Sequence, residues 1–317
     1  MKVTILVPIY NVEQYIAECA RSLFEQTYTD IEYVFCDDCT PDRSIEVLRE
    51  VMEQYPGRKG YVRIIRNDHN KGLGGTRAHL LEEISNNAEG ICDAFAIVDS
   101  DDVLPKNAIE VLVKRMKETD ADIVEGASAD YAGGKQGAVT LTYHGDTKGY
   151  FKRILCQNIL SNHVWAKLYN VCVLQEVQPL FFEGIDYTED YCATARLCAV
   201  CSRAWTDEVV YLYRTDNVTS YTKTISEKSM QSYFRATREV LHFYRNRGHL
   251  PLQLEVGVQN CYREAEKNGM PYDEVDRVIS YYPEHMRTHI SYKVWRSGLP
   301  FAVRNIFYKI IRAWAIL

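Results

Sequence analysis

Short apolar runs recur along the first 125 residues, and a polar or glycine-rich turn follows each of them. The runs cover residues 2–8, 31–36, 61–66 and 94–98. Runs of this length without polar alternation are typical of parallel strands buried on both faces. The pattern therefore predicts four such strands in this part of the chain.

The segments between these runs have the apolar spacing of helices. Ile16, Ala20, Leu23 and Phe24, for example, recur at intervals that place them on one helical face. Helices are expected at residues 12–26 and 105–118. A further helix is expected to about residue 55, with Thr40 as its N-cap and Pro41 at its first helical position. Another is expected from about residue 76, after a glycine-rich loop at 67–75. Strands that alternate with helices predict an α/β fold with a doubly wound, mostly parallel sheet.

The alternation of strands and helices becomes weaker after residue 125. Residues 126–149 are rich in Gly, Ala and Thr, which favours loops or edge strands, and a late strand is expected at 206–213. Helical spacing dominates from residue 226, with an acidic break near 273–276. An α/β part followed by a helical C-terminal extension is therefore expected.

Polar side chains follow three of the predicted strands. Tyr10 and Asn11 follow the first strand, Asp37 and Asp38 follow the second, and residues 99–102 (Asp-Ser-Asp-Asp) follow the fourth. Ligands of open α/β sheets bind beyond the carboxyl ends of the strands, so these side chains are expected along one edge. Three carboxylates within four residues repel one another, and a hard divalent cation removes that repulsion. Each acidic group alone is also compatible with a solvated turn or a helix cap.

Composition and charge narrow the classes of protein. The 317 residues are 46% apolar and 25% charged, as in globular proteins, and the net charge of −6 argues against nucleic acid as the main partner. The ten cysteines lack the spacing of a secreted disulfide framework, which predicts reduced thiols. No apolar run approaches the ~18 residues of a membrane span, so a cytoplasmic protein is expected, free or peripheral on the membrane.

Seven short motifs stand in order along the chain: Val7–Asn11 with Glu13, Asp37 and Asp38, Asn70–Arg77, Asp99–Asp102, Trp165 with Lys167, Glu189 and Asp190, and Tyr211–Arg214 followed by Ser220. With these motifs the chain resembles bacterial family 2 glycosyltransferases over residues 2–221. The resemblance implies the GT-A nucleotide-sugar fold for residues 1–221. Residues 1–125 would bind the nucleotide sugar, 126–221 would bind the acceptor, and 222–317 would form a helical C-terminal region.

The resemblance also implies a donor site. The nucleobase and ribose pocket is expected to be lined by Pro8, Tyr10, Glu13 and Asp38. Arg77 is expected near the nucleotide and its diphosphate. Asp99 and Asp101, as the DxD element of the family, are expected to hold the ribose, the diphosphate and Mg²⁺ or Mn²⁺.

The implied reaction is an inverting transfer of a sugar from a nucleoside diphosphate, expected to be UDP, to a glycan or lipid-linked acceptor. The acceptor hydroxyl needs a base on the face of the sugar opposite the leaving group, and Asp190 is expected to be that base. The sugar or acceptor side is expected to hold Trp165, Lys167, Glu189 and Arg214. The expected product is a bacterial surface or extracellular polysaccharide.

The last 31 residues form a basic, aromatic tail. Residues 287–317 contain no acidic residue, and the basic ones are Arg287, Lys293, Arg296, Arg304, Lys309 and Arg312. Basic helices with apolar faces are typical of membrane-surface binding, which suits a lipid-linked acceptor. The alternative is a terminal helix that packs on the catalytic domain or on a second subunit.

Other functions compete with glycosyl transfer. Residues 72–77 (GLGGTR) are similar to the glycine-rich signature of sugar-1-phosphate nucleotidyltransferases, but that signature should follow the first strand and here follows the third. A dinucleotide-dependent oxidoreductase would need a GxGxxG between the first strand and its helix, and the chain has none there. A catalytically inactive module that binds nucleotide sugars stays an alternative.

Overall fold

The structure is a computed structural model that describes residues 1–86, 92–156, 162–217, 226–248, 253–279 and 290–316. Two residues named above, Ser220 and Arg287, lie outside these ranges. The chain divides into two compact units. The first comprises Met1–His144, His163–Gly184 and Val200–Tyr221, and the second comprises Gly145–Asn162, Ile185–Ala199 and Thr222–Leu317. Two segments from the predicted acceptor half therefore group with the C-terminal helices.

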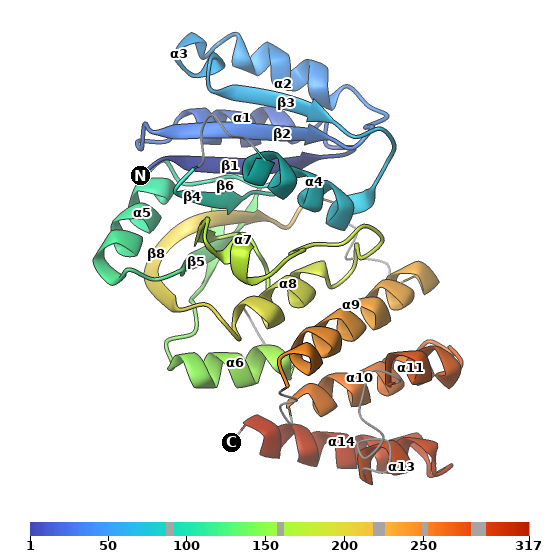
Figure 1. The fold of residues 1–317 in the computed structure, drawn as a ribbon. Coiled ribbons are helices and arrows are strands. Elements are labelled where there is room, and N and C mark those ends of the chain that lie inside the picture. Colours follow the sequence, from blue (N-terminus) through green and yellow to red (C-terminus); the bar gives the residue numbers. More distant parts are fainter. Residues whose placement is uncertain (87–91, 157–161, 218–225, 249–252, 280–289, 317) are drawn as a thin grey trace. The chain divides into compact units, whose positions relative to one another are not determined.

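The first unit contains an eight-stranded sheet among the described residues (Figure 1). The sheet order is β3 (Val62–Arg66), β2 (Ile31–Asp37), β1 (Val3–Ile9), β4 (Ala94–Ile97), β7 (Lys167–Asn170), β5 (Ile123–Ala132) and β6 (Lys135–Thr140), with β8 (Arg203–Arg214) paired to β5. Strands β3, β2, β1 and β4 are mutually parallel, as are β5 and β8, whereas β7 and β6 are antiparallel to their neighbours. The predicted mostly parallel α/β sheet is confirmed.

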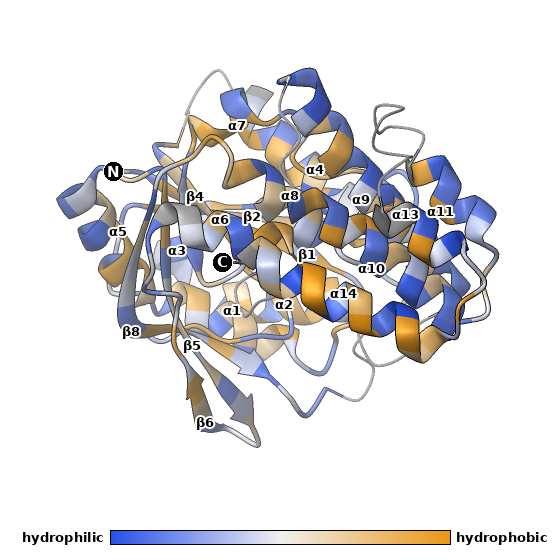
Figure 2. Cartoon of the chain, turned by 90° about the horizontal axis from the view of Figure 1, so that it is seen from below, coloured by the Kyte–Doolittle hydropathy of each residue, from blue (hydrophilic) through white to orange (hydrophobic). Residues whose placement is uncertain are grey.

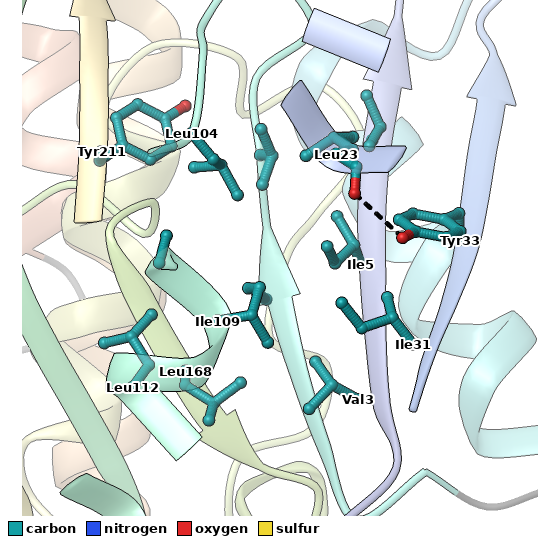
Figure 3. Close-up of a cluster of buried hydrophobic side chains, with 14 of the residues drawn as sticks. Val3, Ile5, Leu23, Ile31, Tyr33, Leu104, Ile109, Leu112, Leu168 and Tyr211 are labelled. Carbon is teal, nitrogen blue, oxygen red and sulfur yellow. Dashed lines mark hydrogen bonds between the residues drawn. The ribbon is translucent and has the colours of Figure 1, made fainter. Parts of the chain in front are cut away.

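Helices cover both faces of the parallel strands, which makes the sheet doubly wound. Phe24 of α1 (Ile16–Phe24) packs edge-on against Tyr33 of β2, with ring centroids 5.2 Å apart. Cys36 points to the opposite face of β2 and contacts His79 of α4 (Gly72–Asn86). Figure 3 shows the apolar side chains that fill the first face, including Ile5 of β1 and residues of α5 (Ala108–Thr119).

Strand β1 extends one residue beyond its predicted end at Pro8. The strand continues from Pro8 to Ile9. The ladder between β1 and β4 ends where Leu6 faces Ile97. Pro8 lies beyond this point, so its missing N–H removes no hydrogen bond from that ladder. The β2 side of the ladder continues to Ile9, which pairs with Asp37.

Helix α2 (Ser44–Met52) begins later than predicted, and the short α3 (Pro56–Lys59) follows it. Thr40 was expected to be the N-cap of this helix. Its hydroxyl instead accepts a hydrogen bond from the Asn11 N–H at 2.8 Å and donates one to Asp42 at 2.7 Å. The threonine therefore ties the loop after β2 to the loop after β1.

Helix α4 begins at Gly72, so part of the predicted glycine-rich loop is the first turn of a helix. Gly75 in this turn lies so close to Lys71 that an added Cβ would stand 2.7 Å from the Lys71 Cβ. A side chain at this position would therefore displace the turn. Helix α5 begins at Ala108 after Asn107, three residues beyond the predicted start.

The weakly patterned middle of the chain contains both predicted kinds of structure. Strand β6 is an edge strand within 126–149 and is exposed along its whole length, whereas β5 pairs with β6, β7 and β8 and is a mostly buried interior strand. The late strand is longer than predicted, because β8 extends from Arg203 to Arg214. Helix α7 (Val173–Glu176) follows β7 directly.

The second unit is helical in its described residues: α6 (Thr147–Leu155), α8 (Glu189–Leu197), α9 (Glu227–Asn246), α10 (Gln253–Lys267), α11 (Tyr272–Ile279), α13 (Ile290–Arg296) and α14 (Phe301–Ile316). Ser226 caps α9, since its hydroxyl accepts the Ser229 N–H. The predicted acidic break at 273–276 is wrong: these residues lie in α11, where Asp273 and Glu274 occupy the first turn and favour the positive end of the helix dipole.

Two further properties concern the cysteines and the length of the helices. All ten cysteines are free thiols, as their scattered spacing predicts. Within the described ranges, no helix combines the length and apolarity needed to cross a bilayer.

Candidate active site

The carboxyl ends of β1, β2 and β4 carry the predicted donor-site residues. Because these strands are parallel neighbours, their ends share one edge of the sheet. Tyr10, directly after β1, is 48% exposed, which is high for an aromatic side chain beside a core strand. Pro8 is buried, and the Glu13 carboxylate accepts the Arg43 N–H at 3.1 Å.

Asp38 fixes the loop that leads into α4. Its Oδ1 accepts hydrogen bonds from the Lys71 N–H at 2.7 Å and from the Asn67 side-chain amide at 2.6 Å. Its Oδ2 accepts the Gly72 N–H at 3.0 Å, at the start of the helix. Asp38 is only 3% exposed, so it provides a buried acceptor for N–H groups where α4 begins. Its predicted contact with a nucleobase stays a prediction.

Arg77 of α4 is joined to Asp99 after β4. The Nη2 atom donates to Asp99 Oδ1 at 2.7 Å, and the arginine is 1% exposed. Its guanidinium carbon also lies 5.7 Å from the centre of the Phe181 ring. Because Asp99 is 23% exposed, this pair presents one side of the carboxylate to solvent and holds the other side in a fixed orientation.

Asp101 is oriented from the far end of β8. The Asn217 side-chain amide donates to Asp101 Oδ2 at 2.7 Å, and Arg214 Nε donates to the Asp101 carbonyl at 2.5 Å. Burial and, next, the neighbouring Asp99 carboxylate raise the pKa of Asp101 above its ordinary value. The Asp101 carboxylate thus lies near that of Asp99, in an environment that disfavours the negative charge of Asp101.

A hard divalent cation suits this pair. In the described part of the chain, no three His, Cys, Asp or Glu side chains form a complete metal cage. Mg²⁺ sites commonly use one or two carboxylates together with substrate phosphates and water rather than a protein cage. The oxygen donors of Asp99 and Asp101, and the repulsion between them, fit that kind of site.

Arg214 is buried under the same turn. Its Nη2 donates to Glu18 of α1 at 2.5 Å, and its guanidinium carbon lies 4.9 Å from the centre of the Tyr15 ring. Tyr131 of β5 also donates to Glu18. The structure thus places the Arg214 side chain between α1 and the Asp101 carbonyl, and its predicted contact with sugar or acceptor stays a prediction.

The Trp165 and Lys167 segment is ordered by stacking and by buried charge. The Trp165 indole stacks on Tyr211, with ring centroids 4.6 Å apart. The Lys167 ammonium is buried, lies 3.6 Å from Glu125 and donates to the His163 carbonyl at 2.5 Å. This lysine therefore neutralises a buried carboxylate, and its predicted place on the acceptor side stays a prediction.

Glu189 and Asp190 belong to the second unit, where they form the first turn of α8. Glu189 is buried and Asp190 is partly exposed. Thr188, which precedes them, has a left-handed backbone with φ of 66° and provides no side-chain cap. Carboxylates at this end of a helix are stabilised by its dipole, which is a structural reason for the pair, and the predicted role of Asp190 as a base stays a prediction.

Several residues of the site have no simple signal in the sequence. Asn217 lies three residues beyond the closing strand in an irregular segment, and only the fold brings its amide to Asp101. Asp102 and Tyr211 contact each other across the turn, although neither stood out as more than part of a motif. Asn67 bridges Asp38 and Thr76 beneath the same edge.

Two curated proteins are similar to this chain in sequence. "Glycosyltransferase GlyA" of Streptococcus pneumoniae is 26% identical over 272 residues, which are 81% of this chain and 36% of GlyA. "Poly(ribitol-phosphate) beta-glucosyltransferase" of Bacillus spizizenii is 32% identical over 128 residues, or 40% of this chain and 19% of that protein. The chain therefore spans much less than two thirds of the length of either relative.

Structure and sequence comparisons agree on the fold and the family. S. aureus TarS (residues 1–349), solved in complex with UDP, superimposes with a TM-score of 0.66 at 18% identity, covering 99% of this chain and 90% of TarS. That likeness shows the same fold. The sequence profile described as "Glycosyl transferase family 2" matches residues 4–177, which is more than half of the chain. The chain therefore belongs to glycosyl transferase family 2.

Proposed function

We propose that this protein is an inverting glycosyltransferase that transfers the sugar of a UDP-sugar to a hydroxyl of a glycan or lipid-linked acceptor. The observation that carries the proposal is the ion pair between the buried Arg77 and the partly exposed Asp99, beside Asp101 at the carboxyl end of β4. Family membership gives the reaction class, and the UDP complex of TarS supports the choice of nucleotide. The named activity of the Bacillus spizizenii relative supports a bacterial surface polymer as the product.

The donor half of the mechanism rests on charge. Asp99 and Asp101 would hold Mg²⁺ or Mn²⁺, which when bound stabilises negative charge on a diphosphate leaving group. Arg77 adds a guanidinium that its contact with Asp99 keeps in one orientation. Tyr10 is exposed enough to stack on a nucleobase at the end of β1.

The acceptor half rests on Asp190. A carboxylate that removes the acceptor proton while the hydroxyl attacks the anomeric carbon completes a single displacement, which inverts that carbon. Asp190 is partly exposed at the start of α8, so it is open to solvent and also held by a helix. Glu189, which is buried beside it, would orient the segment.

The first experiment is a thermal-shift screen of UDP, GDP, dTDP and CDP, each with and without Mn²⁺. A ligand that binds the folded state at 100 times its Kd stabilises it by about 2.7 kcal/mol. We expect UDP with Mn²⁺ to raise the melting temperature more than any of the other nucleotides does. UDP without Mn²⁺ should raise it less than UDP with Mn²⁺. A metal-dependent shift with another nucleotide would correct the donor, and no shift with any of the four would contradict the donor site.

The sugar-1-phosphate nucleotidyltransferase alternative has little support. Its glycine-rich signature should form a loop after the first strand, whereas Gly72–Arg77 begins helix α4 after β3. The inactive binding module predicts the same nucleotide shifts as the enzyme. Only a measurement of sugar transfer or donor hydrolysis separates those two functions.

The C-terminal helix α14 is the proposed contact with a membrane. One of its faces is apolar and exposed, and the residues on it are Val303, Ile306, Phe307, Ile310 and Trp314, with exposed fractions from 38% to 63%. Figure 2 shows the hydrophobic colour along much of α14. Lys309 is exposed on the same helix and Lys293 on α13, where they suit anionic headgroups.

The opposite face of α14 packs inside the second unit. Arg304 donates to Glu266 at 2.5 Å and to the Tyr272 hydroxyl at 2.7 Å, and Tyr308 is 2% exposed. Arg296 pairs with Asp276. Two of the basic residues counted in the tail thus have internal acidic partners. Apolar area, more than net charge, supports the membrane contact.

Replacing both Ile310 and Trp314 with serine is expected to weaken binding to anionic vesicles by about tenfold or more, since each side chain contributes roughly 1.5–3 kcal/mol when buried. Both side chains are exposed, so the melting temperature should change little. Co-sedimentation with phosphatidylglycerol vesicles measures the effect, and Tyr61→Ser, at a 56% exposed position, is the control. Equal binding of all three proteins would contradict the membrane contact.

A further inference from the structure

Tyr211 of β8 connects both ends of the turn that carries Asp99 and Asp101. Its hydroxyl donates to Asp102 Oδ2 at 2.7 Å and accepts the Asp99 N–H at 3.1 Å. The side chain is 1% exposed. A single buried hydroxyl group thus joins the first residue of the turn to the last.

Asp102 differs from the two other carboxylates of the turn. Its Oδ1 accepts the Arg214 N–H at 2.7 Å, while its Oδ2 accepts the Tyr211 hydroxyl. The residue is 1% exposed, whereas the Asp99 side chain is 23% exposed. Both Asp102 oxygens are therefore directed at β8, and neither is presented to solvent where a nucleotide would arrive.

The backbone and the ring of Tyr211 strengthen this connection. Val103 and Leu212 form an antiparallel bridge, with N–H to carbonyl distances of 3.2 and 2.9 Å. The Tyr211 ring is stacked on Trp165, at an interplanar angle of 18°. The Asp99–Asp102 turn is thus attached to β8 by side chains at both ends and by main chain immediately after it.

We propose that Tyr211 and Asp102 are positioning residues, which hold the turn so that Asp99 and Asp101 present their carboxylates to the metal and the diphosphate together. This inference rests on the proposed function and names two groups that act through other residues. Without the Tyr211 hydroxyl the Asp99 N–H loses its acceptor and Asp102 loses a donor, so the turn gains alternative conformations. Binding that needs both carboxylates at once then weakens, although the fold persists.

The test compares Tyr211→Phe with Tyr33→Phe. Tyr33 is also a fully buried tyrosine of the first unit, and its hydroxyl donates to the Leu23 carbonyl at 3.0 Å, away from the turn (Figure 3). Tyr33→Phe loses one buried hydrogen bond and Tyr211→Phe loses two, so both melting temperatures should fall, and that of Tyr211→Phe should fall further. Isothermal titration at a temperature well below both transitions then measures the Kd for UDP with Mn²⁺ and for Mn²⁺ alone.

We expect Tyr211→Phe to weaken metal-dependent UDP binding by about tenfold and Tyr33→Phe to leave it within about twofold of wild type. Asp102→Asn, which keeps the size of the side chain but removes one acceptor, should weaken binding in the same direction and serves if Tyr211→Phe does not fold. Wild-type affinity in both turn variants would overturn the positioning role alone. No metal-dependent binding by the wild-type protein would overturn the donor site and this inference with it.

Discussion

Asp101→Ala is expected to abolish metal-dependent binding of UDP, with a loss of affinity of about 100-fold or more, while the fold is retained. The reason is that, in the proposed site, Asp101 and Asp99 would be the pair of oxygen donors at the end of β4, and Arg77 already donates to one oxygen of Asp99. In the Asp101→Ala protein only Asp99, one of whose oxygens already accepts from Arg77, would be left to hold the cation. Titration of UDP with and without Mn²⁺ measures the loss, and Asp130→Ala, at an exposed position of β5, is the control.

The metal-free protein provides an independent readout at the same position. Burial and the Asp99 charge raise the pKa of Asp101, so the ionised carboxylate is less stable in the folded protein than in the unfolded chain. This group stabilises the fold only below its unfolded pKa and costs stability at neutral pH. Asp101→Asn, which retains a partner for Asn217, is therefore expected to raise the melting temperature of the metal-free protein at pH 7. Unchanged UDP affinity in both Asp101 variants would contradict the metal site.

Local pattern was sufficient to predict β1, β2, β3 and β4, because burial on both faces requires continuous apolar runs, but it did not predict β7 or the buried part of β5. Helix starts were harder to predict, since they depend on partners that are distant in sequence. Threonine is a residue type that commonly caps helices, but the Thr40 hydroxyl accepts the Asn11 N–H instead, and α2 begins four residues later. Conversely, Gly72 begins α4 because Asp38 accepts its N–H from the end of another strand.

The same distinction applies to the site. Topology brings Arg77 and Asp99 together, because α4 packs on β1 and β4 is the next strand in the sheet, so that contact was predictable. Lys167 was not predictable in the same way. Its burial follows from Glu125 on β5, and Arg203 of β8 pairs with that carboxylate at 2.7 Å. The sequence around a lysine does not show whether its charge faces a ligand or a buried acid.

Asp190→Asn is expected to keep the Kd for UDP with Mn²⁺ and to lower turnover by about 10²–10⁴-fold, the range that a general base contributes. Asparagine has nearly the same shape but cannot accept the acceptor proton. Release of UDP from the UDP-sugar is the measurement, because water can replace an unidentified acceptor and needs the same base. The binding constant separates this role from a structural one, because a distorted donor site would lower affinity as well.

The helix dipole makes a second control necessary for this variant. Removing a carboxylate from the first turn of a helix costs about 0.3–1 kcal/mol whether or not the group is catalytic. Glu227→Gln removes an equivalent charge from the first turn of α9 and should leave turnover unchanged. Equal loss of turnover in both variants would assign Asp190 to helix stability, and near-normal turnover in Asp190→Asn would remove it as the base. The wild-type protein could also bind UDP with Mn²⁺ but neither release UDP from UDP-sugars nor transfer sugar to acceptors. That result would make the chain a binding module rather than an enzyme.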